Sequence, residues 1–389
     1  MVTESEQRKR VDTKGYEMSR TGCESMAEPS WESMVAMWQP AESGVRLLRL
    51  FGQSQEAILP DRIEGRPVTE IGPYCFSASE RYPREGYQLT GMIRRLFVDK
   101  APMERAGEWT EHRIDGIDRV DLPAICGKYV ERVWMPDTVT TLHNAAFYNC
   151  RNLRQISLGG QIRAIGSDEF MNCLRLNRLI LRGSVEEENG LELLLERLTT
   201  DVEIHFQPGD RKRMLARGEE CVLFFPEYYE WLNEVTPAHI FSRSIEGEGL
   251  RMRRVFRDGR LDLSKYDQCY PSVMLSETDE NLCRIALCRL QYPLKLSRES
   301  ADLYEKAMRE RPQQLMEILL QDRDAEALQF VCRKLSPETG VLSQWMERCI
   351  AAEWGEAVAY LMDAKRSKMT EKKYDFDDFD TFDDPEDDM

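Results

Sequence analysis

The sequence repeats itself with a period of 23 residues. One copy, VTTLHNAAFYNCRNLRQISL, spans Val139–Leu158, and the next, IRAIGSDEFMNCLRLNRLIL, spans Ile162–Leu181. The apolar positions recur at this step, and so does the Asn-Cys pair at 149–150 and 172–173. A fixed period of about 20–50 residues is typical of stacked repeats, in which each unit buries its apolar side against its neighbours. The repeat therefore predicts a solenoid.

The strand part of the repeat extends beyond these two copies. Two columns of apolar residues keep the same spacing: Val133, Ile156, Leu179 and Val202, and Met135, Leu158, Leu181 and Ile204. Such columns are expected when short parallel strands stack in register. In the last copy a helix-like stretch, LELLLERL from Leu191, replaces the middle of the repeat. That change fits a terminal unit, which ends the stacking and covers the core.

These residues resemble the bacterial BspA-like leucine-rich repeats. The pattern of that family, an apolar-Thr-x-Ile-Gly step, then Ala-Phe-x-x-Cys, then Leu-x-x-Ile-x-Leu-Pro, fits Val139–Leu158 best. The stretch AILPDRIEGRPVTEIGPYCF, Ala57–Phe76, resembles the opening repeat of the family. The resemblance extends from about Gly44 to Phe206 and implies an α/β solenoid that binds other proteins. Between Phe76 and Val120 the spacing is irregular, so the number of repeats there stays open.

In the strand motif, the positions between the core residues are expected to point outwards. Stacking places them in rows, of which one holds Trp134, Ser157, Ile180 and Glu203. An exposed Trp beside an exposed Ile, bordered by arginines, has the composition of an interaction hot spot. We therefore predict a protein-binding surface made of Arg132, Trp134, Arg154, Gln155, Arg178, Ile180, Arg182, Glu203 and His205. Two alternatives stay open: the rest of the chain covers this face, or it is plain solvated surface.

The second half of the chain has the periodicity of helices. The 23-residue columns end after Pro208-Gly209, and from about Glu277 apolar residues recur at steps of three and four. Helix starts are indicated at Ser297, at Ser336-Pro337-Glu338, and at Asp322 or Asp324. The segments LSRESADLYEKA and LSPETGVLSQWM, 39 residues apart, suggest stacked helical hairpins. We predict an all-α domain of helical repeats, ankyrin-like or similar, although the Thr-Pro-Leu-His signature of ankyrin repeats is missing.

The charge is concentrated at the end of the chain. The formal net charge is −16, and residues 374–389, YDFDDFDTFDDPEDDM, contain nine acids and no base. Like charges at this density predict a disordered tail, for which a solubilising role and a docking role are both open. In the docking hypothesis the aromatic residues Tyr374, Phe376, Phe379 and Phe382 bind near Arg251, Arg253, Arg254 and Arg257, in the same molecule or in a partner.

The segment Arg251–Arg260 stands out because it has five arginines and one aspartate. Its simplest interpretation is a charged helix face with Met252, Val255 and Phe256 buried. The alternative is an enzyme or a nucleotide- or phosphate-binding site around His239 and Arg251–Arg260. The acidity of the whole chain argues against nucleic acid as a partner, since phosphate binding normally needs a surplus of positive charge.

The sequence contains no motif that indicates catalysis. GxSxG, HExxH and the P-loop are missing, none of the four histidines lies near another histidine or a cysteine at ligand spacing, and the eleven cysteines include no CxxC pair. We therefore expect no enzyme activity, no cofactor and no metal. The chain also shows no signal peptide and no apolar run of about 20 residues, which predicts a cytoplasmic protein that does not enter a membrane.

These observations predict four segments. They are an N-terminal segment at 1–33, partly disordered; a leucine-rich repeat domain at 34–207; an α-helical domain at 211–368; and a disordered acidic tail at 369–389. We expect a bacterial scaffold protein that binds a protein partner through the strand face of its repeats, with the helical domain as a second surface. A surface adhesin exported by an unrecognised route is the other alternative, because BspA-like proteins are often adhesins.

Overall fold

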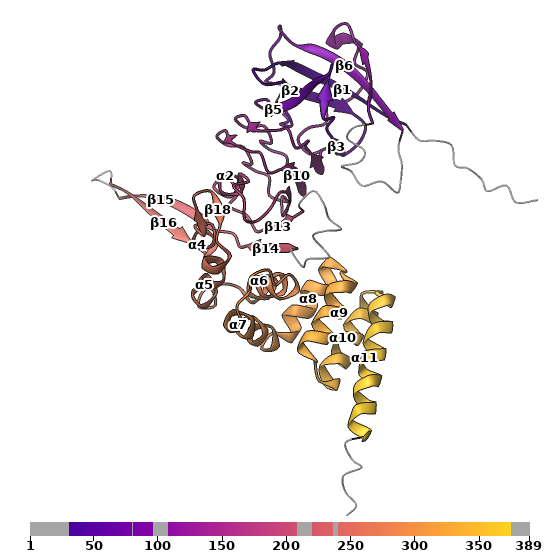
Figure 1. Cartoon of the computed structure of the whole chain (residues 1–389), viewed down its shortest axis with the longest axis vertical. Coiled ribbons are helices and arrows are strands. Elements are labelled where there is room, and N and C mark those ends of the chain that lie inside the picture. Colours follow the sequence, from indigo (N-terminus) through magenta and orange to yellow (C-terminus); the bar gives the residue numbers. More distant parts are fainter. Residues whose placement is uncertain (1–30, 80, 96–107, 208–219, 236–239, 375–389) are drawn as a thin grey trace, which may run out of the picture.

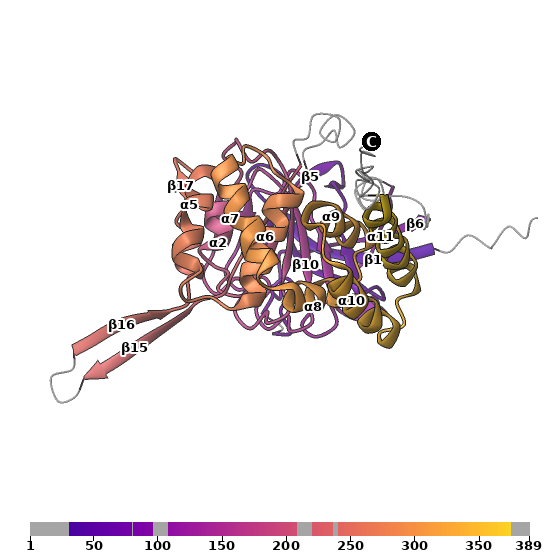
Figure 2. The ribbon, with the colours of Figure 1, turned by 90° about the horizontal axis from the view of Figure 1, so that it is seen from below.

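A computed structural model describes residues 31–79, 81–95, 108–207, 220–235 and 240–374. Figure 1 shows an elongated molecule, with a β-solenoid at one end and a set of stacked helices at the other. The predicted fold class is confirmed: a repeat solenoid in the N-terminal half is followed by a helical region. A two-stranded arm projects from the junction between the two (Figures 1 and 2).

The repeats build one side of the solenoid as a six-stranded sheet, here called the repeat sheet. Its strands, in spatial order, are β3 (Glu56–Ile58), β8 (Arg132–Trp134), β10 (Gln155–Gly159), β12 (Arg178–Arg182), β13 (Val202–Phe206) and the antiparallel β14 (Cys221–Phe225). β8, β10 and β12 pair in parallel at the predicted 23-residue step. Residues that are 23 positions apart in the sequence therefore lie side by side in β8, β10 and β12.

The register changes by two residues at the last repeat. Ile180 lies opposite His205, and Arg178 lies opposite Glu203. The prediction that Glu203 continues the row of Ile180 was therefore wrong. The physical reason is the terminal repeat itself, which contains helix α2 (Leu191–Leu195) and needs a step of 25 rather than 23 residues.

The other side of the solenoid is a mixed sheet in the order β11-β9-β5-β2-β1-β6-β7, with β4 paired to β5. Its strands are β1 (Trp31–Pro40), β2 (Val45–Gly52), β4 (Arg62–Ile63), β5 (Arg66–Ile71), β6 (Gln88–Arg95), β7 (Thr110–Arg113), β9 (Thr141–Leu142) and β11 (Ala164–Ile165). Strands β2, β5, β9 and β11 are parallel, whereas β1, β6 and β7 extend the sheet by antiparallel pairing.

The irregular stretch of the sequence is an insertion between two neighbouring turns. β3 pairs directly with β8, with Glu56 opposite Arg132 and Ala57 opposite Val133. After β4 and β5, the chain between them forms β6, β7 and the 3₁₀ turn η1 (Ile117–Arg119), and part of it covers the outer face of β1 and β2 with a second, smaller apolar cluster. Ala57–Phe76 is thus a spatial neighbour of the 23-residue repeats, as its resemblance to them implies.

Identical side chains stack along the solenoid. The ring of Phe147 lies 4.9 Å from that of Phe76 and 5.7 Å from that of Phe170, measured between centroids. The Cys150 thiol donates to the carbonyl oxygen of Phe76 at 3.1 Å, and the Cys173 thiol to that of Phe147 at 3.0 Å. Each turn therefore supplies both an apolar contact and a hydrogen bond to the turn before it.

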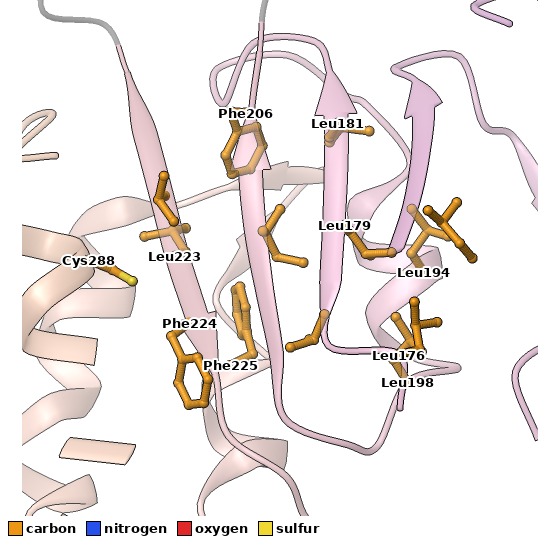
Figure 3. Close-up of a cluster of buried hydrophobic side chains, with 14 of the residues drawn as sticks. Leu176, Leu179, Leu181, Leu194, Leu198, Phe206, Leu223, Phe224, Phe225 and Cys288 are labelled. Atoms are coloured by element: carbon orange, nitrogen blue, oxygen red, sulfur yellow. The ribbon is translucent and has the colours of Figure 1, made fainter. Parts of the chain in front are cut away.

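The solenoid and the helices share one apolar core. A single cluster of buried residues extends from Met34 to Leu361. At the end of the repeats, leucines of the repeat sheet pack beside Leu194 and Leu198, and Cys288 of helix α6 (Asp279–Gln291) lies next to β14 (Figure 3). β14 is buried along its whole length, because the solenoid covers one face and the helical region contacts the other.

Between the two halves lie a long and a short hairpin. The long one is β15 (Tyr229–Val235) and β16 (Ile240–Glu246); the short one, after helix α4 (Gly249–Met252), is β17 (Phe256–Arg257) and β18 (Arg260–Leu261). The short turn places Asp258 and Gly259 in the left-handed region, with φ of 52° and 72°. The predicted single helix over Arg251–Arg260 was therefore wrong, although Met252, Val255 and Phe256 are buried as expected. Asp-Gly between two short strands is the usual sequence of such a turn and could have indicated it.

The helical region begins with α5 (Leu263–Val273) and continues as stacked helices. They are α6 (Asp279–Gln291), α7 (Arg298–Arg309), α8 (Pro312–Asp322), α9 (Ala325–Leu335), α10 (Thr339–Ala351) and α11 (Gly355–Tyr374). Ser297 and Asp324 cap α7 and α9 as predicted, each accepting a backbone N–H three residues on. Ser336 instead ends α9 in a left-handed conformation, and α10 begins after Glu338.

One fully buried ion pair joins the first helices of this region. The Arg289 guanidinium donates to both carboxylate oxygens of Asp267, at 2.7 and 2.9 Å, and the Tyr304 hydroxyl donates to the same carboxylate at 2.9 Å. The remaining Arg289 N–H groups reach the carbonyl oxygens of Tyr292 and Leu294. Every polar group of the pair has a partner, as a buried charge requires.

Candidate binding surface

Five of the nine predicted contact residues lie on the open part of the repeat sheet, over β8, β10 and β12. The side chains of Arg132 and Arg178 are 54% and 48% exposed, and Arg154 is also exposed. Trp134 and Gln155 are half-buried beside them. The structure therefore brings together three arginines, a tryptophan and a glutamine on one face.

Glu56 of β3 orients the tryptophan. The indole Nε1 of Trp134 donates to Glu56 Oε1 at 3.3 Å, and Arg132 Nη1 lies 4.0 Å from the same oxygen. Glu56 is brought here because β3 pairs directly with β8 across the insertion. Sequence patterns could not indicate this neighbour, because Glu56 and Arg132 are 76 positions apart in the chain.

Arg182 is not available to a partner, contrary to the prediction. It is 9% exposed, and its guanidinium donates to Asp137 Oδ1 at 2.6 Å, to the Ser157 hydroxyl and to the Met135 carbonyl oxygen. Ser157 is fully buried as a result. The long side chain lies along the sheet and bonds to the two preceding turns, so its role in this structure is to hold the repeats together.

Ile180 is also a correction, since it is only 8% exposed. Further along the sheet, α6 packs against β14, and Val222 and Phe224 are buried. These two residues lie opposite His205 and Glu203, on the same side of the sheet. The alternative that the rest of the chain covers this face therefore holds at the C-terminal end of the repeat sheet.

Glu203 and His205 form a small polar cluster at this boundary. The two side chains are hydrogen-bonded, and Arg178 Nη2 lies 3.4 Å from Glu203 Oε1. Burial alone would raise the pKa of Glu203, but the hydrogen bond from His205 and the charges of His205 and Arg178 hold it below its usual value. Glu203 is thus ionised at neutral pH and neutralises part of the arginine charge at this end of the face.

A groove of about 600 Å³ runs between the repeat sheet and the helices. The solenoid side is lined by Arg154, Leu174, Arg175, Leu176, Asn177, Arg178, Thr200, Asp201, Glu203, Phe224 and Glu227, and the helical side by Glu280, Arg284 and Asp322. Arg284 is held by Glu280 at 3.1 Å and by Asp322 at 3.0 Å. The exposed arginines of the groove therefore lie on the repeats, whereas the arginine of the helical side is held between two carboxylates.

The predicted cationic segment Arg251–Arg260 is largely neutralised or buried. Arg253 is 6% exposed and donates to the carbonyl oxygens of Leu198 and Thr200 at 2.8 and 2.7 Å. Burial lowers its pKa to about 10. Arg251 pairs with Glu248, and Arg257 lies 3.5 Å from Asp262. The prediction that Arg253 receives the acidic tail was therefore wrong, because its guanidinium is already occupied by the backbone.

Two hypotheses involve this segment: docking of the acidic tail, and an enzyme or phosphate-binding site with His239. The other residues that they require lie outside the described part of the chain. This holds for His239 and for Phe376, Phe379 and Phe382, and the described part of Tyr374 is its backbone alone. Docking of the acidic tail therefore stays a prediction. Among the exposed arginines of the segment, Arg254 and Arg260 have no ion pair with any described residue.

The described residues contain no cluster suited to a metal ion. No group of three or more His, Cys, Asp and Glu side chains in this part of the chain is placed to hold one. The ten described cysteines are free, and burial raises the pKa of several thiols, for example that of Cys221 to about 12. Within the same residues, no helix has the length and apolarity that crossing a membrane requires.

Comparison with known proteins finds one family. Residues 124–189 match the BspA type leucine rich repeat region, in six copies. The matched residues lie within the solenoid and include β8, β10 and β12, which carry the open face described above. No curated protein and no solved structure matches the chain.

Proposed function

We propose that this chain, whose N-terminal half contains a BspA-type leucine-rich repeat region, is a non-enzymatic scaffold that binds a protein partner on the open part of its repeat sheet. A leucine-rich repeat solenoid fits a protein-interaction role in general. The contact residues are Arg132, Trp134, Arg154, Gln155 and Arg178, and the groove beside α6 continues the surface towards the helices.

The observation that carries this proposal is an oriented tryptophan among exposed arginines on a rigid sheet. Tryptophan and arginine dominate the energetics of protein interfaces, and a preformed surface loses little conformational entropy on binding. Trp134 is held by Glu56, and its strand is fixed on both sides by parallel neighbours. The surface therefore suits a partner segment that places an apolar side chain on Trp134 and acidic side chains opposite Arg154 and Arg178.

The experiment starts with a photo-crosslinking amino acid at Gln155, introduced in the native host. The expected result is a crosslinked protein that can be identified and purified. Its affinity is then measured for the wild-type chain, for Trp134→Ala and for Arg178→Glu. Each substitution should weaken binding at least about tenfold, because each removes a central contact of the surface.

Arg163→Glu is the matched control, because this exposed arginine precedes β11 on the opposite side of the same solenoid. It introduces the same charge change and should leave the affinity unaltered. Equal affinities of the wild-type chain, Trp134→Ala and Arg178→Glu would show that the partner binds elsewhere. The circular dichroism spectra and melting temperatures of all variants should agree with the wild type, which excludes loss of folding as the cause.

A further inference from the structure

The long hairpin of β15 and β16 is an arm without a core of its own. It leaves the molecule between the solenoid and α4 and projects into solvent in both views (Figures 1 and 2). The two strands pair with each other from Tyr229 opposite Glu246 to Val235 opposite Ile240. Among the strands that the structure describes, no third strand joins them. The outer edges of both strands are therefore open over the described residues.

A two-stranded hairpin in water is marginally stable by itself, and at least three strands or a packing surface are normally needed. An open edge is also a template for pairing with another chain. The root of the arm is well anchored, since Tyr228 N donates to the Thr199 carbonyl oxygen at 2.9 Å and Glu227 N to Asp201 Oδ1 at 2.7 Å. The arm is thus held in place at one end while its strands lack a partner.

The arm exposes large apolar side chains near its root. Trp231 is 54% exposed, Tyr229 is 51% exposed and Ile245 is 43% exposed. Tyr229 and Trp231 are two residues apart on β15 and therefore lie on one face, whereas Ile245, opposite Glu230, lies on the other. The side chains of a further strand at the outer edge of β15 would therefore lie beside this aromatic pair.

We propose that the chain associates with a second copy of itself through the outer edge of β15. The two β15 strands pair antiparallel about a twofold axis at Trp231, which makes one four-stranded sheet from two arms. In this register Trp231 lies opposite its counterpart, Tyr229 lies opposite Asn233, and Glu230 lies opposite Leu232. Tyr229 and Trp231 of both copies then form a continuous aromatic stripe on one face, and cross-strand aromatic pairs of this kind stabilise a sheet.

The charges of β15 are compatible with a second copy in this register. Glu230 and Glu234 are the two acids of β15, and centring the pairing on Leu232 would set them against each other. Centring on Trp231 opposes no like charges. Like charges directly opposite destabilise a sheet, and pairing of two β15 strands about Trp231 avoids this cost while it sets the aromatic residues of the two copies side by side.

The test is the mass of the full chain in solution, measured by sedimentation equilibrium over a range of concentrations. The wild-type chain should approach twice its mass of 45.4 kDa. Trp231→Ala should raise the dissociation constant at least about tenfold, because it removes the central contact. Leu275→Ala removes an apolar side chain that is 87% exposed on a different part of the molecule, and it should leave the dissociation constant unaltered.

A charge placed at residue 232 separates dimerisation from the stability of the arm itself. Within one chain, residue 232 lies opposite Arg243, but across the proposed interface it lies opposite Glu230 of the second copy. Leu232→Glu should therefore stabilise the single arm and weaken the dimer, while Leu232→Lys should do the reverse. The two effects have opposite signs, so a change that acted only through folding of the arm would give the opposite order of dissociation constants.

Three results would overturn the proposal. One is a wild-type chain that keeps the mass of a single copy up to about 100 µM, because a specific interface would form dimers below that concentration. Another is tighter association of Leu232→Glu than of Leu232→Lys. Dimers that persist unchanged in Trp231→Ala would likewise place the contact elsewhere in the molecule.

Discussion

The two halves of this molecule are stabilised in different ways. In the solenoid, the same small contacts recur at each turn: a phenylalanine ring on the next ring, and a cysteine thiol on the carbonyl oxygen of the turn before. In the helical region, the ion pair of Arg289 and Asp267 occurs once and joins α5, α6 and α7 through Tyr304. The polar contacts of the solenoid recur from turn to turn, whereas those of the helical region include one buried network that links its first helices around a shared apolar core.

This difference determines what a single substitution can do. In a repeat array, each turn contacts only its neighbours, so the loss of one contact is local. A buried charge that loses its partner is not solvated by water. The loss therefore lowers the free energy of unfolding strongly. The following three predictions test the contrast, from the largest expected effect to the smallest.

Arg289→Met should lower the free energy of unfolding by about 3–5 kcal/mol, because it leaves the Asp267 carboxylate buried without its counter-ion. Urea unfolding followed by circular dichroism measures this. The triple variant Arg289→Met, Asp267→Leu, Tyr304→Phe removes every polar member of the pair and should recover most of the loss. A loss of less than about 1 kcal/mol in the single variant would contradict the importance given to this network.

Glu169→Gln should stabilise the chain at pH 8 but not at pH 5. Glu169 occupies the position of Ala146 in the preceding copy, and its side chain is buried, which raises its pKa well above the ordinary value of 4.5. The folded state therefore binds a proton more tightly than the unfolded state. The stabilisation this provides is complete below about pH 4.5 and is lost as the pH rises towards the raised pKa, by up to about 1.4 kcal/mol per pH unit.

Glutamine resembles the protonated carboxyl but does not titrate, so the variant should not show this loss. The measurement is the melting temperature of both chains from pH 5 to pH 8. Glu187→Gln, at an exposed position of the same solenoid, should leave the pH profile of the wild type unaltered. Parallel profiles of the wild type and Glu169→Gln would contradict a protonated Glu169 in the folded state.

Asn172→Ala should cost about 1–2 kcal/mol, which is the penalty for placing an ordinary side chain in the left-handed region. Asn149 and Asn172 both have φ of 62°, and Asn172 Nδ2 donates to Asn149 Oδ1 at 2.7 Å. Asn172→Gly tolerates the same φ and loses the hydrogen bond alone, so it should be the more stable of the two variants. Equal stabilities of the Ala and Gly variants would show that backbone conformation is not what these asparagines provide.

The solenoid could be predicted well from the sequence because its core residues recur every 23 residues. The columns through Ile156 and Leu179 give the true pairing of β8, β10 and β12. The step fails at Val202, where α2 adds two residues. This change depends on how the last turn packs on the core. The spacing of the preceding repeats does not indicate it.

The binding surface could be predicted only in part. Alternation placed Trp134, Arg178 and Arg182 on the outer side of their strands, but it could not show that Arg182 would bend onto Asp137 and Ser157. Nor could it show that α6 would cover β14, since such contacts join residues far apart in the chain. The arm was also missed, because strands without a core have no buried face to give their sequence a clear period.

The two-residue change of step at β13 has a consequence for how this architecture can vary. Strand β14 runs against the repeats, and α6 packs on it, so no further parallel turn can follow. The regular register lies upstream, between β8 and β12. New repeats can therefore be added only in the interior of the array. A tandem duplication of residues 139–161 should lengthen the solenoid while both ends keep their contacts. Cooperative unfolding of the duplicated chain would verify this expectation. The number of interior repeats can therefore change during evolution, while the contacts at the two ends of the solenoid stay the same.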